Sequence, residues 1–169
     1  QGNQYWEYAI EVSPQPLVEC VFPLGVSRGT TTELSAAGFL LPEKPLSINL
    51  DAATQLGEQW ITAKVDDQAS TPFAVEVTDL PLVAEASADN NKPDQGQLLP
   101  VPCGLNGRLE TEGDVDYYTL EAKKGEAISL EVIARRRNSA MDSHLRVLND
   151  KGVQLQLNDD LKVGKRGFS

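Results

Sequence analysis

Hydrophobic and polar positions alternate along this chain in short runs, and turn-forming residues separate the runs. In the first run, Tyr5–Val12, the side chains of Tyr8, Ile10 and Val12 share one side, as in a β-strand. Gly and Pro then punctuate the chain at intervals of about 8–12 residues, a spacing typical of β-sandwiches. The strands predicted between these breaks are Leu17–Phe22, Thr31–Ala37, Leu46–Leu50, Gln59–Val65 and Phe73–Val77.

The composition changes between Glu85 and Gln97, where EASADNNKPDQGQ shows no apolar periodicity. We interpret this segment as an interdomain linker. Beyond it, Asn149–Gly152 (NDKG) predicts a hairpin turn, because Asn, Asp and Gly accept the positive φ that such turns require. The strands expected in this part are Leu105–Glu110, Asp116–Ala122, Ala127–Ala134, His144–Asn149 and Val153–Asn158.

The 169 residues suffice for one large or two small domains, and the change in composition favours two. We therefore expect an all-β chain of two small β-sandwiches, at residues 13–84 and 98–169, joined by the linker 85–97. No stretch approaches the roughly 20 apolar residues of a membrane span, so no membrane insertion is expected. The formal charge of −10 disfavours nucleic-acid binding.

A set of short motifs in the second half resembles the bacterial pre-peptidase C-terminal domain, in particular the copies in large secreted proteins of planctomycete-type bacteria. The matching stretches are Asn106-Gly107, Gly113–Tyr118 (GDVDYY), Ala122–Glu126 (AKKGE), Ala134–Arg136 (ARR) and Asp159-Asp160. The resemblance implies a small non-catalytic sandwich of jelly-roll type, found beside secreted peptidases and in cell-surface proteins. It implies a secreted or cell-surface location, extracellular or periplasmic in a bacterium.

The first half is similar to the immunoglobulin-like TIG/IPT domain, which has a proline turn, a glycine and a strand ending in G-x-L. The matching residues are Phe22–Val26 (FPLGV), Arg28-Gly29 and Ala37–Leu40 (AGFL). This resemblance implies an immunoglobulin-like sandwich over residues 13–84.

Pre-peptidase C-terminal domains close their sandwich with further strands after the Asn-Asp-Asp turn, whereas this sequence stops at Ser169. Gly2–Val12 resembles the final strand of a preceding copy, so residues 1–12 are expected to belong to such a copy. We expect a fragment of a longer repeated protein, in which strands pair with neighbouring domains of the same or a like chain.

Two oxygen-rich clusters are candidate calcium sites. Asp114 and Asp116 share one side of a predicted strand, and Asn158–Asp160 follows another; calcium takes six to eight oxygen ligands of this kind. In collagenase relatives of the family, an acidic linker motif also holds calcium, which adds the linker residues here, although the motif's proline is absent. Turn capping by the same side chains stays open. The candidate ligands are Glu85, Asp89, Asn90, Asp114, Asp116, Asp159 and Asp160.

His144 is the only histidine, so a histidine-based triad or two-histidine metal site is excluded within the sequence. Arg135–Arg137 is interpreted as a strand end whose guanidinium groups pair with surface carboxylates, with an acidic partner as the alternative. Cys20 and Cys103 are expected to be buried free thiols, although an interdomain disulfide stays open. The aromatic residues expected to pack in the core are Trp6, Trp60, Tyr117 and Tyr118.

We therefore expect a non-enzymatic structural or adhesion module of a larger secreted protein. The alternative is a polymer-binding or export appendage of a secreted hydrolase, with a polysaccharide or other extracellular polymer as its ligand.

Overall fold

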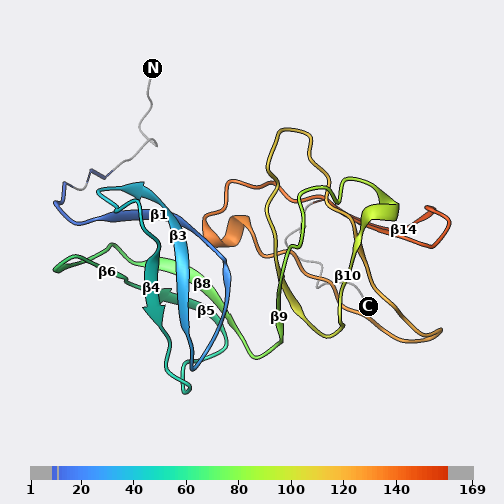
Figure 1. Ribbon diagram of the computed structural model, residues 1–169, viewed down its shortest axis with the longest axis horizontal. Helices are drawn as coiled ribbons and strands as arrows, with labels where there is room; N and C mark the ends of the chain where they lie inside the picture. Colours follow the sequence, from blue (N-terminus) through green and yellow to red (C-terminus); the bar gives the residue numbers. More distant parts are fainter. Residues whose placement is uncertain (1–8, 11, 160–169) are drawn as a thin grey trace.

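The computed structural model describes residues 9, 10 and 12–159 and has two lobes (Figure 1). We call residues 13–84 the first unit and residues 85–159 the second unit. Regular structure in the described residues consists of β-strands and two short 3₁₀ turns, which confirms the all-β prediction. No helix in this part of the chain is long and apolar enough to cross a bilayer.

The first unit contains two three-stranded sheets that face each other (Figure 1). One is antiparallel and has the order β1 (Leu17–Phe22), β3 (Thr31–Phe39), β4 (Leu46–Asn49). The other has the order β2 (Gly25–Ser27), β8 (Phe73–Thr78), β5 (Gly57–Ile61), with β2 parallel and β5 antiparallel to β8. A small hairpin, β6 (Lys64–Val65) with β7 (Gln68–Ala69), extends this unit.

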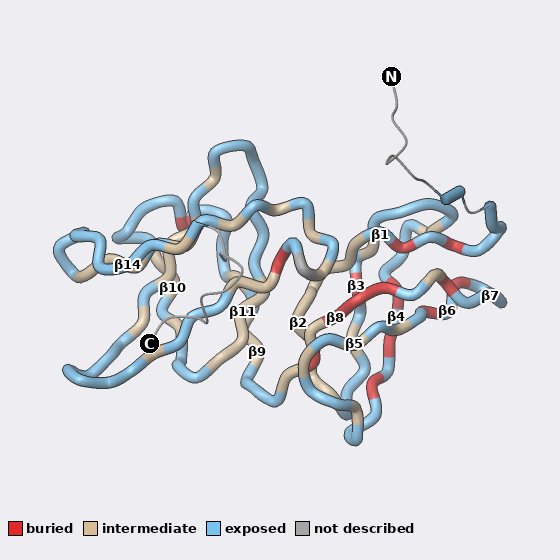
Figure 2. Tube along the Cα trace, turned by 180° about the vertical axis from the view of Figure 1, so that it is seen from behind, coloured by how far each residue is buried: buried red, intermediate tan, exposed pale blue. Residues whose placement is uncertain are grey.

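The hydrophobic core lies between these two sheets. In β8 the alternation is direct: Phe73, Val75 and Val77 point inward and are at most 1% exposed, whereas Glu76 points outward. Leu34 of β3 is fully buried opposite them. Burying each such side chain stabilises the fold by about 1.5–3 kcal/mol. The buried segments of Figure 2 therefore gather in the first unit.

The second unit is built from short pairs of strands. The last strand of the first unit, β9 (Leu82–Ala84), pairs in parallel with β11 (Gly104–Asn106) of the second unit. Within the second unit, β10 (Gln97–Leu98) pairs in parallel with β12 (Tyr118–Thr119), and β13 (Leu145–Leu148) forms a hairpin with β14 (Gln154–Asn158). The 3₁₀ turns are η1 (Pro93–Gln95) and η2 (Arg135–Arg137). Among its described residues only Asn90 and Ala134 are buried, so this unit shows no apolar cluster comparable with that of the first.

The sequence located the strands of the first unit more accurately than those of the second. The five runs predicted between residues 17 and 77 overlap β1, β3, β4, β5, β6 and β8, with the run Gln59–Val65 divided between β5 and β6. The hairpin around Asn149–Gly152 is confirmed. The strand predicted at Ala127–Ala134 is wrong, and that at Asp116–Ala122 shrinks to Tyr118–Thr119. Alternation of apolar and polar residues is a reliable sign of a strand only where a neighbouring sheet buries the apolar side of that strand. The strand predicted at Tyr5–Val12 lies largely outside the described residues.

Candidate metal centre

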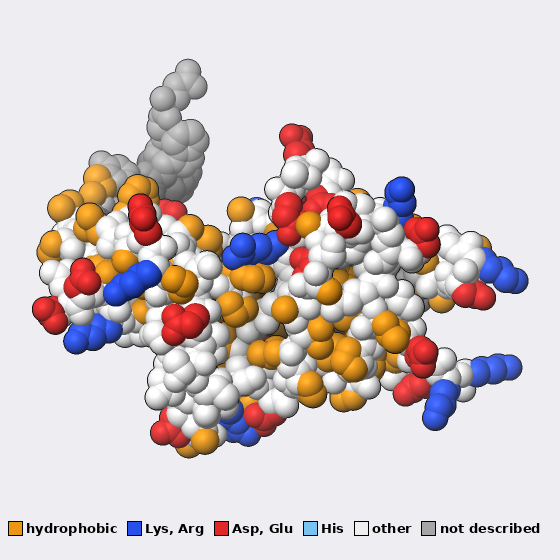
Figure 3. All heavy atoms as spheres, viewed as in Figure 1, with side chains coloured by type: hydrophobic (Ala, Val, Ile, Leu, Met, Phe, Trp, Pro, Cys, Tyr) orange, Lys and Arg blue, Asp and Glu red, His pale blue; other side chains and the backbone are white. Residues whose placement is uncertain are grey.

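A loop at residues 107–117 projects from the second unit, and acidic side chains gather around it (Figure 3). Glu110, Asp114 and Asp116 each place one carboxylate oxygen within 4.8 Å of the others. The loop turns tightly, since the Asp114 N–H donates to the Thr111 carbonyl at 3.2 Å. Asp114 in turn accepts hydrogen bonds from the N–H groups of Glu110 (3.0 Å) and Val115 (2.9 Å). The turn thereby brings Glu110 against Asp114.

Glu85 lies beneath this loop and connects it to the segment predicted as a linker. Its Oε1 accepts hydrogen bonds from Asn90 Nδ2 at 2.8 Å and from the Tyr118 hydroxyl at 3.0 Å. Its Oε2 accepts one from the Arg108 backbone N–H at 2.8 Å. The Tyr118 hydroxyl also lies 3.4 Å from Asp116 Oδ2. Two residues of the predicted linker, Glu85 and Asn90, therefore border the acidic site.

The concentration of negative charge changes the protonation of the site. Burial, with repulsion from Glu85, Asp114 and Glu110, raises the pKa of Asp116 from its ordinary 3.8 to about 6. Burial and the hydrogen bond to Glu85 raise the pKa of Tyr118, so its phenol stays protonated at neutral pH. Desolvation and the hydrogen bond with Asp114 raise the pKa of Glu110 as well. A bound cation would offset this repulsion.

Two oxygens in or beside the cluster are buried without a hydrogen-bond partner: Oδ1 of Asn90 and Oδ1 of Asp116. The Asn90 residue is only 3% exposed. An acceptor buried without a donor costs about 1–3 kcal/mol, so such atoms call for an explanation. Carboxylate and carboxamide oxygens are the ligands that calcium prefers. The donor chemistry of the site therefore fits a hard cation such as calcium.

The structure brings some of the predicted ligands together and separates others. Asp114 and Asp116 meet in the cluster, and Glu85 and Asn90 adjoin it through Tyr118. Asp89 is exposed, and its backbone N–H donates to Ser87 Oγ at 3.0 Å. Two further predicted ligands lie elsewhere: Asp159 is exposed just after β14, and Asp160 lies outside the described residues.

Glu110 was missed by the sequence analysis because it was placed in a regular strand. Had the loop been recognised from Thr111–Asp114 (TEGD), whose Gly113 has φ +83°, Glu110 and Asp114 would have been expected to face each other across the turn.

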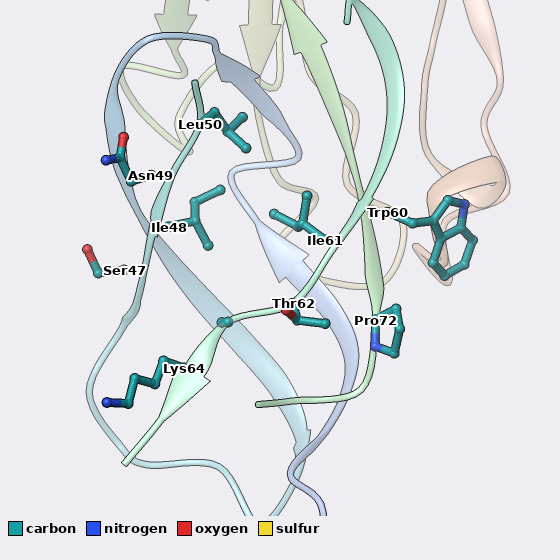
Figure 4. Close-up of a pocket in the computed structure, with 10 residues that line it drawn as sticks. Ser47, Ile48, Asn49, Leu50, Trp60, Ile61, Thr62, Lys64 and Pro72 are labelled. Carbon is teal, nitrogen blue, oxygen red and sulfur yellow. The ribbon is translucent and has the colours of Figure 1, made fainter. Parts of the chain in front are cut away.

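A groove lies on the first unit, between the edge strands β4 and β5 (Figure 4). This groove encloses about 520 Å³, and Ile48, Leu50 and Ile61 point into it. Trp60 points away, to the other side of β5. The residue is 58% exposed, and its Nε1–H donates to Glu58 Oε1 at 2.6 Å. The prediction that Trp60 packs in the core is therefore wrong, because alternation along β5 places it on the outer face of the sheet.

The remaining candidates divide between surface and interior. His144 is exposed, and Cys20 and Cys103 are free and half-buried. The run Arg135–Arg137 forms the 3₁₀ turn η2, so its prediction as a strand end is wrong. The Arg135 guanidinium lies 3.7 Å from Asp142, which is the predicted pairing with a surface carboxylate. Arg137, by contrast, has a side chain only 10% exposed and contacts two carboxylates of the first unit. Trp6 lies outside the described residues, and Tyr117 is half-buried.

No protein-family model, curated protein or solved structure matches this chain.

Proposed function

We propose that this chain is a non-catalytic structural module of a secreted or cell-surface protein, a spacer that holds neighbouring domains apart and is stabilised by calcium. The observation that carries the proposal is the acidic loop: three carboxylates within 4.8 Å, beside the buried, unpartnered oxygens of Asn90 and Asp116. Glu110, Asp114 and Asp116 would hold the cation, with Asn90 close by. The bound ion would neutralise the repulsion that raises the pKa of Asp116.

A structural role agrees with the groups around the cluster. In the described structure these are the Tyr118 phenol, the Glu85 carboxylate and the Asn90 carboxamide, which bind one another. Such a network fixes the loop but pairs no nucleophile with a base. A ligand that binds only the folded state raises stability by mass action, by about 2.7 kcal/mol at a concentration of 100 Kd.

The surface location rests on the resemblance to pre-peptidase C-terminal and TIG/IPT domains. Partner binding by strand pairing is supported by the β13–β14 hairpin, whose outer strand β14 has β13 as its one partner among the described strands. Leu155 and Leu157 on β14 are 58% and 45% exposed. Strand addition to this edge would pair its backbone N–H and C=O groups and place new side chains beside these leucines. Light scattering across a concentration series tests the pairing, and a monomer at every concentration would contradict it.

Thermal unfolding with millimolar calcium or a chelator tests the metal centre. We expect calcium to raise the melting temperature of the unmodified protein, and the double variant Asp114→Asn/Asp116→Asn to lose the response. Asp89→Asn and Asp159→Asn are matched controls outside the cluster and should retain it. An equal melting temperature with calcium and chelator would leave the aspartates as turn caps and contradict the metal site.

The exposed ring of Trp60 supports a second candidate function, binding of an extracellular polysaccharide. Its hydrogen bond to Glu58 holds the ring in one orientation, and sugar rings stack on exposed aromatic faces. Pull-down on insoluble polysaccharides tests this function. Retention that disappears in Trp60→Ala but persists in Leu56→Ala, a control at a 52% exposed position, would favour it. No retention on any polymer would exclude it for those tested.

A further inference from the structure

Besides the backbone ladder between β9 and β11, side-chain contacts between the two units converge on one row of residues across a single sheet. In the register of the β2–β8–β5 sheet, Gly25 pairs with Glu76, and Glu76 pairs with Glu58. We call Gly25, Glu76 and Glu58 the docking row. Adjacent strands are about 4.8 Å apart, so the row spans roughly 10 Å.

One anchor is Arg137 of η2. Its guanidinium lies 2.6 Å from Glu58 Oε2 and 2.7 Å from Glu76 Oε2. Glu58 and Glu76 are direct cross-strand partners, and like charges in that position repel. Because the Arg137 side chain is only 10% exposed, its charge is poorly screened by solvent and offsets the repulsion between the two carboxylates. The outer face of the first unit thus carries two adjacent carboxylates, and the guanidinium of Arg137 from the second unit binds both.

The other anchor is Asn106, at the end of β11. Its Oδ1 accepts the Gly25 N–H at 2.8 Å, and its Nδ2 donates to the Gly25 carbonyl at 3.0 Å. The carboxamide thereby satisfies the free edge of β2 as a neighbouring strand would. A Cβ atom at position 25 would lie 3.2 Å from Asn106 Oδ1, so glycine permits this close approach.

Two further contacts support docking at the same place. The Arg108 guanidinium lies 3.8 Å from the centroid of the Phe22 ring at the end of β1. The turn η2 of the second unit also packs against β8. The second unit, which shows no apolar cluster of its own in the described residues, is held by these contacts together with the β9–β11 ladder.

We infer that the docking row is a built-in interdomain surface on which Arg137 and Asn106 act together, so that the two units form one rigid body. This inference deepens the spacer role proposed above, since a spacer with a fixed angle sets both the distance and the direction of what it joins. It stands on contacts outside the acidic cluster. A failure to bind calcium would therefore leave the rigid docking untouched, and a failure of the rigid docking would leave the calcium site untouched.

Amide exchange of the full chain, followed by NMR, tests the joint action of the anchors. The Gly25 N–H reports on Asn106, whereas Arg137 lies at the other end of the row. We expect Arg137→Ala to accelerate exchange at Gly25 by about tenfold or more, although it leaves the Asn106 contact chemically intact. Arg135→Ala, at an exposed arginine of the same turn, should leave this exchange unchanged. Unchanged Gly25 exchange in Arg137→Ala would overturn the inference.

A second measurement covers the case in which Arg137→Ala does not fold. The variant Glu58→Gln keeps Arg137 and its contact with Glu76, removes one of the two facing charges, and should accelerate Gly25 exchange less than tenfold. Residual dipolar couplings of the unmodified protein then test rigidity directly. One alignment tensor should fit residues 13–84 and 85–159 together, and two different tensors would overturn the inference.

Discussion

The hydroxyl of Tyr118 donates a hydrogen bond to Oε1 of Glu85 at 3.0 Å, which connects strand β12 to the first residue of the second unit. Glu85 also binds the Arg108 backbone, two residues beyond the Asn106 anchor. The acidic loop and the interdomain surface are therefore neighbours on one stretch of chain. Four predictions concern the stability of the acidic site and of the first unit.

Tyr118→Phe should lower the free energy of unfolding by about 1–2 kcal/mol, because it removes a hydrogen bond to a charged carboxylate in a half-buried site. Chemical denaturation measures the change. Tyr117→Phe is the matched control, since Tyr117 lies outside the hydrogen-bond network of Glu85. An equal loss in both variants would show that the Tyr118–Glu85 contact adds nothing specific.

The stability of the calcium-free protein should depend on the protonation of Asp116. Its pKa is raised in the folded state from 3.8 to about 6, so the folded state holds this proton more tightly than the unfolded chain. The contribution of Asp116 is therefore most favourable below pH 4 and is lost as the pH rises to about 6 and above.

The difference in unfolding free energy between the unmodified protein and Asp116→Asn isolates this group. We expect the unmodified protein to lose stability relative to Asp116→Asn as the pH increases from 4 to 7. A difference that stays constant over this range would contradict the raised pKa.

Gly38→Ala should be strongly destabilising, by about 3 kcal/mol or more. Gly38 has φ +154°, and a Cβ there would lie 1.9 Å from the Leu17 carbonyl oxygen, beside the bulge in the β1–β3 ladder. Gly113 also has a positive φ, +83°, but has open space around it. Gly113→Ala should cost only about 1–2 kcal/mol, from backbone strain. Similar losses in the two variants would show that β1 and β3 can separate at the bulge.

Leu34→Ala should lower the free energy of unfolding by about 2–5 kcal/mol, because Leu34 is fully buried between the sheets of the first unit. Leu155→Ala removes the same atoms from a side chain that is 58% exposed and should change stability by less than about 0.5 kcal/mol. Denaturant unfolding of both variants compares the units directly. A large loss in Leu155→Ala would mean that β14 is covered in solution.

The sequence by itself determined the all-β class, the longer strands of the first unit (β1, β3, β4, β5 and β8) and the turn at Asn149–Gly152, but not the short strands β2, β7 and β9. These features are local, because they depend on the alternation of apolar and polar residues over five or six positions and on the Gly and Pro residues that interrupt it. The sequence also placed Asp114 and Asp116 together by strand alternation, whereas in the structure these two residues meet in a loop.

Tertiary structure decided which distant groups meet. Glu110 joins the acidic cluster through a turn, Trp60 is exposed because of the face on which it lies, and Glu85 is a packed hydrogen-bond acceptor in a segment that lacks periodicity. The partnership of Arg137 with Glu58 and Glu76 depends on the register of β5 and β8 and on where η2 docks. The sequence shows which side chains are charged or polar, but the packing of residues that are far apart in the sequence sets which of these side chains become partners.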